Sequence, residues 1–451
     1  MLLTRKFSPK NLTYVTLYNR IEERLDVSKK KITRSNNLNF LDLFAGCGGL
    51  SEGFIRAGFS PVAHIEMDQA ASNSLKTRMC YHWLKEHNKL TLYYDYLNKK
   101  ISRNALYSSV PFEVIDSVIN EEISENTLTD MFRNIDQKLD KQKLFLIIGG
   151  PPCQAYSLIG RSCEKENMLN DKRNYLYKYY AEFLKHYKPE HFVFENVTGL
   201  LSAKDPDGNR HLDNMLQLFK SIGYESTPYI LNAKEYGVPQ NRRRVIILGN
   251  RKGCKKLDLN IPKNPCKCTI NELFEDLPRI YAGGNADKYS KCTNKLLSNL
   301  KIRENQVPLT FQMARPNTKQ DLSIYKLAVE KWEQKECRLN YNDIPSSLQT
   351  HKNKSAFTDR FKVVAGNLTY SHTVVAHVAK DGHYYIHPDI EQNRSLTPRE
   401  VARIQTFPDD FYFEGIKDEV CRTAAYKQIG NAVPVVLAEK IAQHIKDSLI
   451  D

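Results

Sequence analysis

The sequence contains no apolar run that approaches the roughly 20 residues of a membrane-spanning helix. Its first residues, Met1–Lys6, also lack the apolar stretch of a secretory signal peptide. The 10 cysteines are scattered along 451 residues, which excludes the dense framework of a small disulfide-bonded domain. We therefore expect reduced thiols and a cytoplasmic protein with no membrane contact. Cys266 and Cys268 have no second cysteine pair to complete a zinc site, so we expect no metal.

The charge balance is strongly basic. Lysine and arginine number 66 against 52 acidic residues, which leaves a net charge of +14. Such an excess favours a polyanionic partner, most commonly a nucleic acid, although a generally basic proteome would give the same balance. The apolar fraction of 41% and the charged fraction of 26% are ordinary for globular proteins. The length allows two to three domains, or one large domain with a smaller one.

Short apolar segments alternate with helical periodicity from Phe40 onward. We expect a helix over 50–57 and strands over 41–44, 62–65, 144–148, 192–194 and 245–248. This alternation predicts an α/β fold with a doubly wound, mostly parallel sheet.

The chain divides into four parts by composition. Residues 1–38 form a basic N-terminal extension with one amphipathic helix. We expect this helix to pack on the main domain rather than to bind DNA. Residues 252–393 are rich in Lys, Asn, Tyr and Pro, and we expect them to form an irregular domain with a strand over 373–378. The predicted parts are 1–38, a main domain over 39–251 with an insertion at 98–143, the irregular domain over 252–393, and a C-terminal segment over 394–451 that completes the main domain.

One turn stands out for chemistry. Gly149-Gly150-Pro151-Pro152-Cys153-Gln154 directly follows the predicted strand over 144–148. The prolines restrict the backbone and the glycines allow close approach, so Cys153 is held at the carboxyl end of the strand, where open α/β sheets bind ligands. This pattern favours a nucleophile over an incidental cysteine in a strand-ending turn.

Three further motifs accompany it. The glycine-rich turn Phe44–Gly49 precedes a helix, and Glu66 ends the next strand, where a carboxylate can accept hydrogen bonds from ribose hydroxyls. Dinucleotides and S-adenosylmethionine both carry a ribose, and the alternative for Glu66 is a carboxylate that stabilises a helix N-terminus. Glu195 follows the strand over 192–194 as a candidate general acid or ring-nitrogen anchor. Arg242 and Arg244 are separated by one residue, so in an extended backbone their side chains lie on the same face. The alternative is that this run forms a solvated basic loop.

Together these motifs closely resemble the DNA (cytosine-5)-methyltransferases. Their order and spacing match from about residue 39 to 445. The irregular domain over 252–393 stands where that family has its target-recognition domain. The matching segments are 40–50, 150–154, 195–197, 240–244, 394–400 and 428–434.

The resemblance implies a Rossmann-like methyltransferase fold and a covalent mechanism on a cytosine that is flipped out of duplex DNA. The Cys153 thiolate would add to C6, and Glu195 would bind N3 and the exocyclic amine. The activated ring would then attack the methyl group of S-adenosylmethionine, and loss of the C5 proton would release Cys153. Arg244 would contact the cytosine carbonyl, and Arg242 would support the site or a phosphate.

The resemblance also assigns binding residues. Asp95 is the nearest candidate for the adenine-binding aspartate that this family has after its third strand, although its surroundings are unusual. The loop from Gln154 to about Arg173 would close over DNA. Expected cofactor residues are Phe44, Gly46, Gly48, Gly49, Leu50, Glu66, Asp95, Pro151, Asn431 and Val433. Expected DNA-binding residues are Gln154, Ser157, Arg161, Arg173 and Gln240.

The setting implied is a bacterial, monomeric enzyme that protects one short sequence from a partner restriction endonuclease, or else a solitary methyltransferase. A tRNA cytosine methyltransferase is an alternative, but the Cys-Phe-Thr motif typical of that group is absent. A catalytically silent DNA-binding protein conflicts with the intact Cys153, Glu195 and Arg244. A nicotinamide-dependent oxidoreductase would not explain the Pro-Pro-Cys-Gln sequence.

Overall fold

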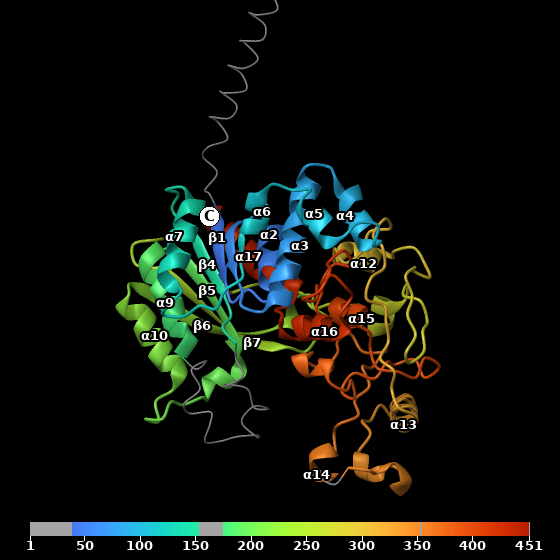
Figure 1. The fold of residues 1–451 in the computed structure, drawn as a ribbon. Helices are drawn as coiled ribbons and strands as arrows, with labels where there is room; N and C mark the ends of the chain where they lie inside the picture. Colours follow the sequence, from blue (N-terminus) through green and yellow to red (C-terminus); the bar gives the residue numbers. More distant parts are fainter. Residues whose placement is uncertain (1–37, 153–174, 352–353, 451) are drawn as a thin grey trace, which may run out of the picture. The chain divides into compact units, whose positions relative to one another are not determined.

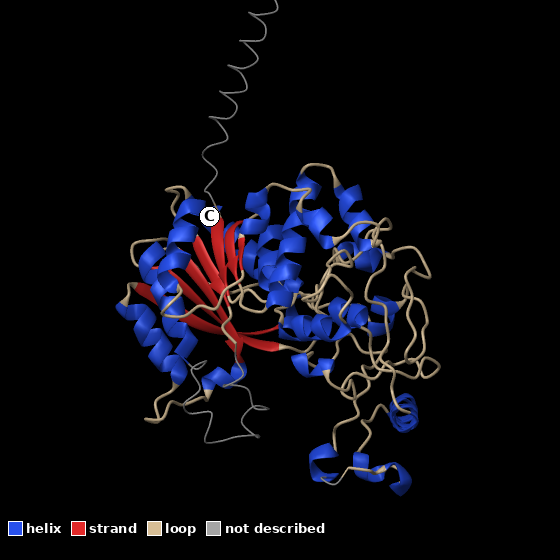
Figure 2. Ribbon diagram, viewed as in Figure 1, coloured by secondary structure: helices blue, strands red, loops and turns tan. Residues whose placement is uncertain are grey.

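A seven-stranded sheet organises the chain in the computed structural model, which describes residues 38–152, 175–351 and 354–450 (Figures 1 and 2). The strand order is β3-β2-β1-β4-β5-β7-β6. Buried aliphatic and aromatic residues fill β1, β4 and β5, as expected for strands covered on both faces. The strands are β1 (Asn39–Leu43), β2 (Ser60–Ile65), β3 (Val118–Ile119), β4 (Leu146–Gly149), β5 (His191–Val197), β6 (Tyr224–Asn232) and β7 (Arg243–Arg251).

The sheet is parallel from β3 through β5, and β7 runs antiparallel to both β5 and β6. The predicted doubly wound, mostly parallel α/β fold is therefore confirmed. The chain order reverses between β1 and β4, because β2 and β3 extend the sheet on one side and β5 on the other. Ligands of open α/β sheets bind in the crevice at such a reversal, beyond the carboxyl ends of the strands.

Helices cover both faces of the sheet (Figure 1). On one face, α2 (Gly49–Arg56) packs against α17 (Val435–Ile450), so the two ends of the described chain share a layer. On the other face, α7 (Leu128–Leu139), α9 (Leu176–Tyr187) and α10 (His211–Ser221) bury Tyr180 and Phe219 against β1, β4 and β5. Four helices lie between β2 and β3 in the chain. They are α3 (Gln69–Glu86), α4 (Leu90–Leu97), α5 (Arg103–Tyr107) and α6 (Phe112–Asp116).

Beyond β7 the backbone is mostly irregular, with short helices between long loops (Figure 2). A small separate core of Ile324, Tyr325, Phe361 and Ile386 stabilises part of this region. The helices are α11 (Ile270–Phe274), α12 (Lys295–Asn299), α13 (Lys319–Lys335) and α14 (Lys354–Phe357), followed by α15 (Pro398–Ile404) and α16 (Arg422–Asn431).

Two local predictions are corrected by this fold. The segment 98–143 is not simply an insertion, because it contains the edge strand β3 and the sheet-covering helix α7. The strand expected over 373–378 is also wrong, since Ala376–Ala379 is a short 3-10 helix. The apolar residues Val374 and Val378 are buried, but in a core shared with the C-terminal helices rather than in a sheet.

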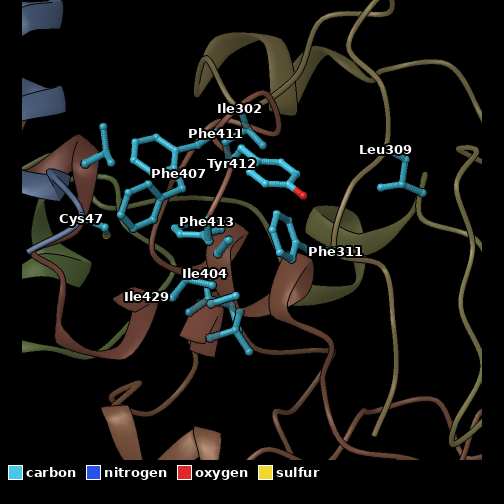
Figure 3. Packing of buried hydrophobic residues seen from close by; sticks show 14 of the residues in the cluster. Cys47, Ile302, Leu309, Phe311, Ile404, Phe407, Phe411, Tyr412, Phe413 and Ile429 are labelled. Carbon is cyan, nitrogen blue, oxygen red and sulfur yellow. The ribbon is translucent and has the colours of Figure 1, made fainter. Parts of the chain in front are cut away.

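The C-terminal segment shares one aromatic core with parts of the chain that are distant in sequence (Figure 3). Phe407, Phe411 and Phe413 from this segment lie in one cluster with Cys47, from the loop after β1, and Phe311, from the irregular region. Burial of this surface stabilises the return of the chain to the main domain, because removing apolar area from water is favourable. The helix α15 begins with a capping box, in which Thr397 and Glu400 satisfy each other's backbone N–H groups, and has Pro398 at its first position.

A buried ion pair stabilises the start of α15. Arg394 donates to both Glu400 oxygens at 2.7 and 2.8 Å, and neither side chain is exposed by more than 1%. Burial alone would raise the pKa of Glu400, but the charges of Arg394 and His387 lower it to about 2. Because this pKa lies below the ordinary value, the carboxylate stabilises the fold above about pH 4.5, and the stabilisation is lost as the pH falls toward 2.

We therefore expect Glu400→Gln to lower the free energy of unfolding by about 3–5 kcal/mol at pH 7, because Arg394 is left buried without its counter-charge. Denaturant unfolding between pH 7 and pH 3 measures the difference from wild type, which should shrink below about pH 4.5. The exposed Glu225 offers a control, and Glu225→Gln should unfold like the wild type. If the difference in unfolding free energy between Glu400→Gln and wild type stayed constant over this pH range, Glu400 would not be the ionised partner of Arg394.

Candidate active site

Three parallel strands end at the same edge of the sheet and bring their following loops together. Leu43 of β1 pairs with Gly149 of β4, and Gly149 pairs with Phe194 of β5. A Cβ on Gly149 would lie 2.3 Å from the Leu43 carbonyl oxygen, so only glycine fits where the strands end. The glycine-rich turn after β1, the Gly-Pro-Pro turn after β4 and the end of β5 consequently surround one space.

An ion pair lies at this edge. Arg244 Nε is 2.8 Å from Glu195 Oε1, and the two side chains are only 10% and 13% exposed. The antiparallel pairing of β5 with β7 places Val197 opposite Arg244 and so brings the two charged residues within reach. Arg244 also donates to the Arg243 carbonyl at 2.8 Å, which fixes the direction of the guanidinium. A carboxylate in this setting can hold a polar ring edge in a defined orientation.

The turn after β4 lies directly against this carboxylate. A Cβ on Gly150 would approach Glu195 Oε2 to 2.6 Å. Pro151 is buried and Pro152 is exposed. The predicted nucleophile Cys153 lies outside the described residues, as do Gln154, Ser157, Arg161 and Arg173.

The turn after β1 is organised by Glu66, which follows β2. Backbone N–H groups of Gly46 and Asp68 both donate to its carboxylate at 2.7 Å. Burial raises the pKa of Glu66, although these two hydrogen bonds oppose the effect. Phe44 and Gly46 both have a φ of 57°, and a Cβ on Gly46 would meet nothing within 4 Å. The turn therefore leaves open space beside a fixed carboxylate.

The C-terminal segment closes the other side of the same turn. A Cβ on Gly49 would lie 2.5 Å from the carbonyl oxygen of Val433, so the two backbones are in direct contact. Gly48 has a φ of 90° and begins α2, whose first residues, including Leu50, are buried. Asn431 ends α16 and is exposed. The expected cofactor residues from both ends of the chain thus meet in space.

Asp95 is the exception among the expected cofactor residues. It lies on α4 and forms an ion pair with Lys100 at 2.8 Å, away from the strand ends. Asn120 directly follows β3, the third strand in the chain. It donates to the carbonyls of Glu66 at 2.9 Å and Met67 at 3.1 Å. Asn120 was not among the residues expected from the sequence, because β3 contains only two residues. The pattern Val118-Ile119-Asn120, an apolar pair followed by a polar residue, was the available signal.

Two residues of the arginine motif, Gln240 and Arg242, are buried in the interior. Gln240 is fully buried and hydrogen-bonds to Gln405 at 2.7 Å, so it has no surface with which to contact DNA. Arg242 is 1% exposed, and its guanidinium donates to the carbonyls of Val374, Gly430 and Ala432. Arg242 directly precedes β7, which begins at Arg243. These contacts suit the expected role of supporting the site.

Within the described ranges, we find no helix with the length and apolar character needed to cross a membrane. In the same part of the chain, no three His, Cys, Asp or Glu side chains are grouped closely enough to hold a metal ion.

The model of the C-5 cytosine-specific DNA methylase family matches residues 38–111 and 116–447. The chain belongs to this family. The prediction of a DNA cytosine-5 methyltransferase is thus confirmed.

Individual relatives agree with this assignment. The chain is 39% identical to the type II methyltransferase M.Bpa9945I of Bacillus paralicheniformis, over 90% of this chain and 98% of the relative. It is 31% identical to the type II methyltransferase M.DdeI of Desulfomicrobium norvegicum, over 90% and 88% of the two chains. A crystal structure described as a DNA modification methyltransferase encoded within an E. coli prophage superposes with a TM-score of 0.56 at 23% identity, covering 92% of this chain and 99% of that one. This last likeness shows the fold.

The contact between Gly150 and Glu195 leads to a prediction. In Gly150→Ala the new methyl group should push the Glu195 carboxylate away from Arg244 and lower the methylation rate at least roughly tenfold. We expect only a modest loss of stability, because the closest atom is the end of a flexible side chain and the Glu195 carbonyl oxygen would lie 3.2 Å from the new Cβ. Steady-state methylation and thermal unfolding measure the two effects.

The control is Gly223→Ala, where a Cβ meets nothing but the φ of 95° imposes strain. It should lose stability, by about 1–2 kcal/mol, and keep its activity. Equal activity of Gly150→Ala and wild type would show that the close packing of the turn does not control Glu195.

Proposed function

We propose that this DNA cytosine-5 methyltransferase uses S-adenosylmethionine to methylate a flipped-out cytosine in one short duplex sequence, with Cys153 as the covalent nucleophile. The observation that carries this proposal is the packing of Gly150, three residues before Cys153, against the Glu195–Arg244 ion pair. A thiolate at this strand end would meet the cytosine beside a carboxylate and a guanidinium. The neighbouring cation would favour the thiolate form.

The two charged residues would divide the recognition of the cytosine between them. Glu195 would accept from the exocyclic amine with one oxygen and hold the N3 edge with the other. Arg244, fixed by Glu195 and the Arg243 carbonyl, would donate to the O2 carbonyl of the base. Both contacts polarise the ring and make C6 open to attack by the thiolate of Cys153.

The space beside Glu66 fits S-adenosylmethionine. This group supplies an activated methyl on a sulfonium when it is bound. Each Glu66 oxygen already accepts one backbone N–H and keeps a lone pair for a ribose hydroxyl. Asn120 holds the Glu66 and Met67 carbonyls with its amide nitrogen, which leaves its oxygen to accept from the adenine amine, and Met67 is 61% exposed beside it. Gly46, Gly49 and Val433 would enclose the methionine end.

The remaining assignments follow from chemistry and from the relatives. We infer that residues 252–393 form the target-recognition region and that the chain acts as a monomer, because one flipped base needs one active site. The two curated relatives reported above are type II methyltransferases of bacteria, so we propose a type II restriction–modification setting in the bacterial cytoplasm, with a partner endonuclease.

The proposal is tested by mapping 5-methylcytosine at base resolution on a mixed-sequence duplex library, after incubation with the purified protein and S-adenosylmethionine. We expect methylation of one cytosine in one short motif. Cys153→Ser should abolish it and keep DNA binding, because the hydroxyl is a far weaker nucleophile at neutral pH. Methylation by the Cys153→Ser variant would refute the covalent mechanism, and methylation of tRNA alone would refute the DNA substrate.

Glu66→Gln tests the cofactor assignment separately. A glutamine amide cannot accept from both Gly46 and Asp68 while it also binds the ribose, so S-adenosylmethionine should bind roughly 10- to 100-fold more weakly. Calorimetric titration without DNA measures this directly. Glu225→Gln, an exposed change on the edge strand β6, is the matched control and should bind like the wild type. Unchanged affinity in Glu66→Gln would place the ribose elsewhere.

A further inference from the structure

Three buried side chains meet where distant segments of the chain come together. Gln240, Arg242 and Gln405, which we call the buried junction, are at most 1% exposed. They lie between the start of β7, the segment 371–376 and the segment 429–433. The first segment leads to Arg244, the second belongs to the proposed recognition region, and the third leads to the turn around the proposed cofactor site.

The junction holds these segments through side chains rather than through sheet pairing. Gln240 donates to Gln405 at 2.7 Å and accepts from the Val374 N–H at 2.9 Å. Arg242 donates to Ala432 at 2.9 Å and also to Val374 and Gly430. Gln405 donates to the carbonyl of Ile429 at 2.7 Å and that of Ala432 at 3.1 Å. A single guanidinium therefore contacts both the recognition region and the C-terminal segment.

The contacts on either side of the junction leave little room for slippage. A Cβ on Gly430 would lie 2.4 Å from the Ala376 nitrogen, and a Cβ on Gly49 would lie 2.5 Å from the Val433 carbonyl. Close-packed backbones of this kind transmit a displacement instead of absorbing it. A shift of the segment 371–376 would consequently reach both the Arg244 strand and the cofactor turn.

We propose that the buried junction aligns the recognition region with the cofactor site and Arg244, with Arg242 as its positioning residue. This inference rests on the proposed function. The planar guanidinium fork matches carbonyls in fixed directions, whereas the ammonium of lysine is a point charge on a flexible stem. Replacing Arg242 by lysine keeps the charge and loses the alignment.

The test is Arg242→Lys in the full chain, followed by calorimetric binding of S-adenosylmethionine without DNA, binding of duplex DNA, and steady-state methylation. We expect the affinity for S-adenosylmethionine to fall roughly tenfold, equivalent to one charge-assisted hydrogen bond. The rate constant kcat should fall by a similar factor, while DNA affinity stays within about twofold, because the junction is buried away from the surface.

Arg315→Lys is the matched control. The Arg315 guanidinium also donates to three backbone carbonyls, those of Val378, Ala379 and Lys380, all of which lie in the irregular region, and it also lies over the Tyr426 ring of α16. It should lose comparable stability and keep the affinity for S-adenosylmethionine. Equal effects of the two substitutions on this affinity would overturn the proposal and leave Arg242 as a general stabilising residue.

A second variant covers the case in which Arg242→Lys does not fold. Gln405→Met preserves the side-chain volume and removes the donations to Ile429 and Ala432, so it should weaken S-adenosylmethionine binding in the same way. Wild-type affinity in this variant would overturn the proposal. A wild-type protein that methylates no DNA would instead refute the proposed function, and that outcome is independent of any junction variant.

Discussion

The antiparallel pairing of β5 with β7 is the constraint on which the candidate active site depends. It places Arg244 beside Glu195, and the ion pair then defines where Gly150 and the following turn can lie. A parallel neighbour at this position would require a long crossover connection. The strand reversal instead brings the arginine motif to the edge where β4 and β5 end, and it does so within the rigid part of the sheet. Reactive groups on such elements are held more accurately than groups on loops.

The C-terminal segment completes this arrangement by returning to the start of the sheet. Its aromatic residues share a core with Cys47 and Phe311, and its backbone touches Gly49. Fully buried arginines accompany this return, among them Arg394, Arg399 and Arg403. Removing these charges from water is costly unless each one is paired, and each forms an ion pair or several carbonyl contacts here. The specificity of these pairs fixes the register of an otherwise irregular chain.

Sequence alone predicted the parts of this architecture that depend on local patterns. Local sequence indicates directly where three strands end: at the apolar run before Gly149, at the glycine-rich turn and at Glu66. The structure brings those residues together. The partners of Arg242 were not predictable in this way, because Ala432, to which it donates, lies 190 residues further along the chain. Alternation of side chains in β7 indicates that Arg242 and Arg244 are related, but not which neighbours they meet. Asn120 was missed for a different reason, since the two residues of β3 carry too weak a pattern to mark a strand.

The distribution of buried charge shows where the basic excess lies that favours a polyanionic partner. Among the described residues, the buried acidic and basic side chains are seven carboxylates and seven arginines, with no lysine. These charges cancel in number, so the interior does not account for the net charge of +14. The excess must lie on the partly or fully exposed residues and on those outside the described ranges. A field of that sign at the surface attracts a phosphate backbone and accelerates encounter with it, without selecting a sequence. Selection must come from neutral or paired side chains that contact base edges, so the base-reading residues need not be those that dominate the charge.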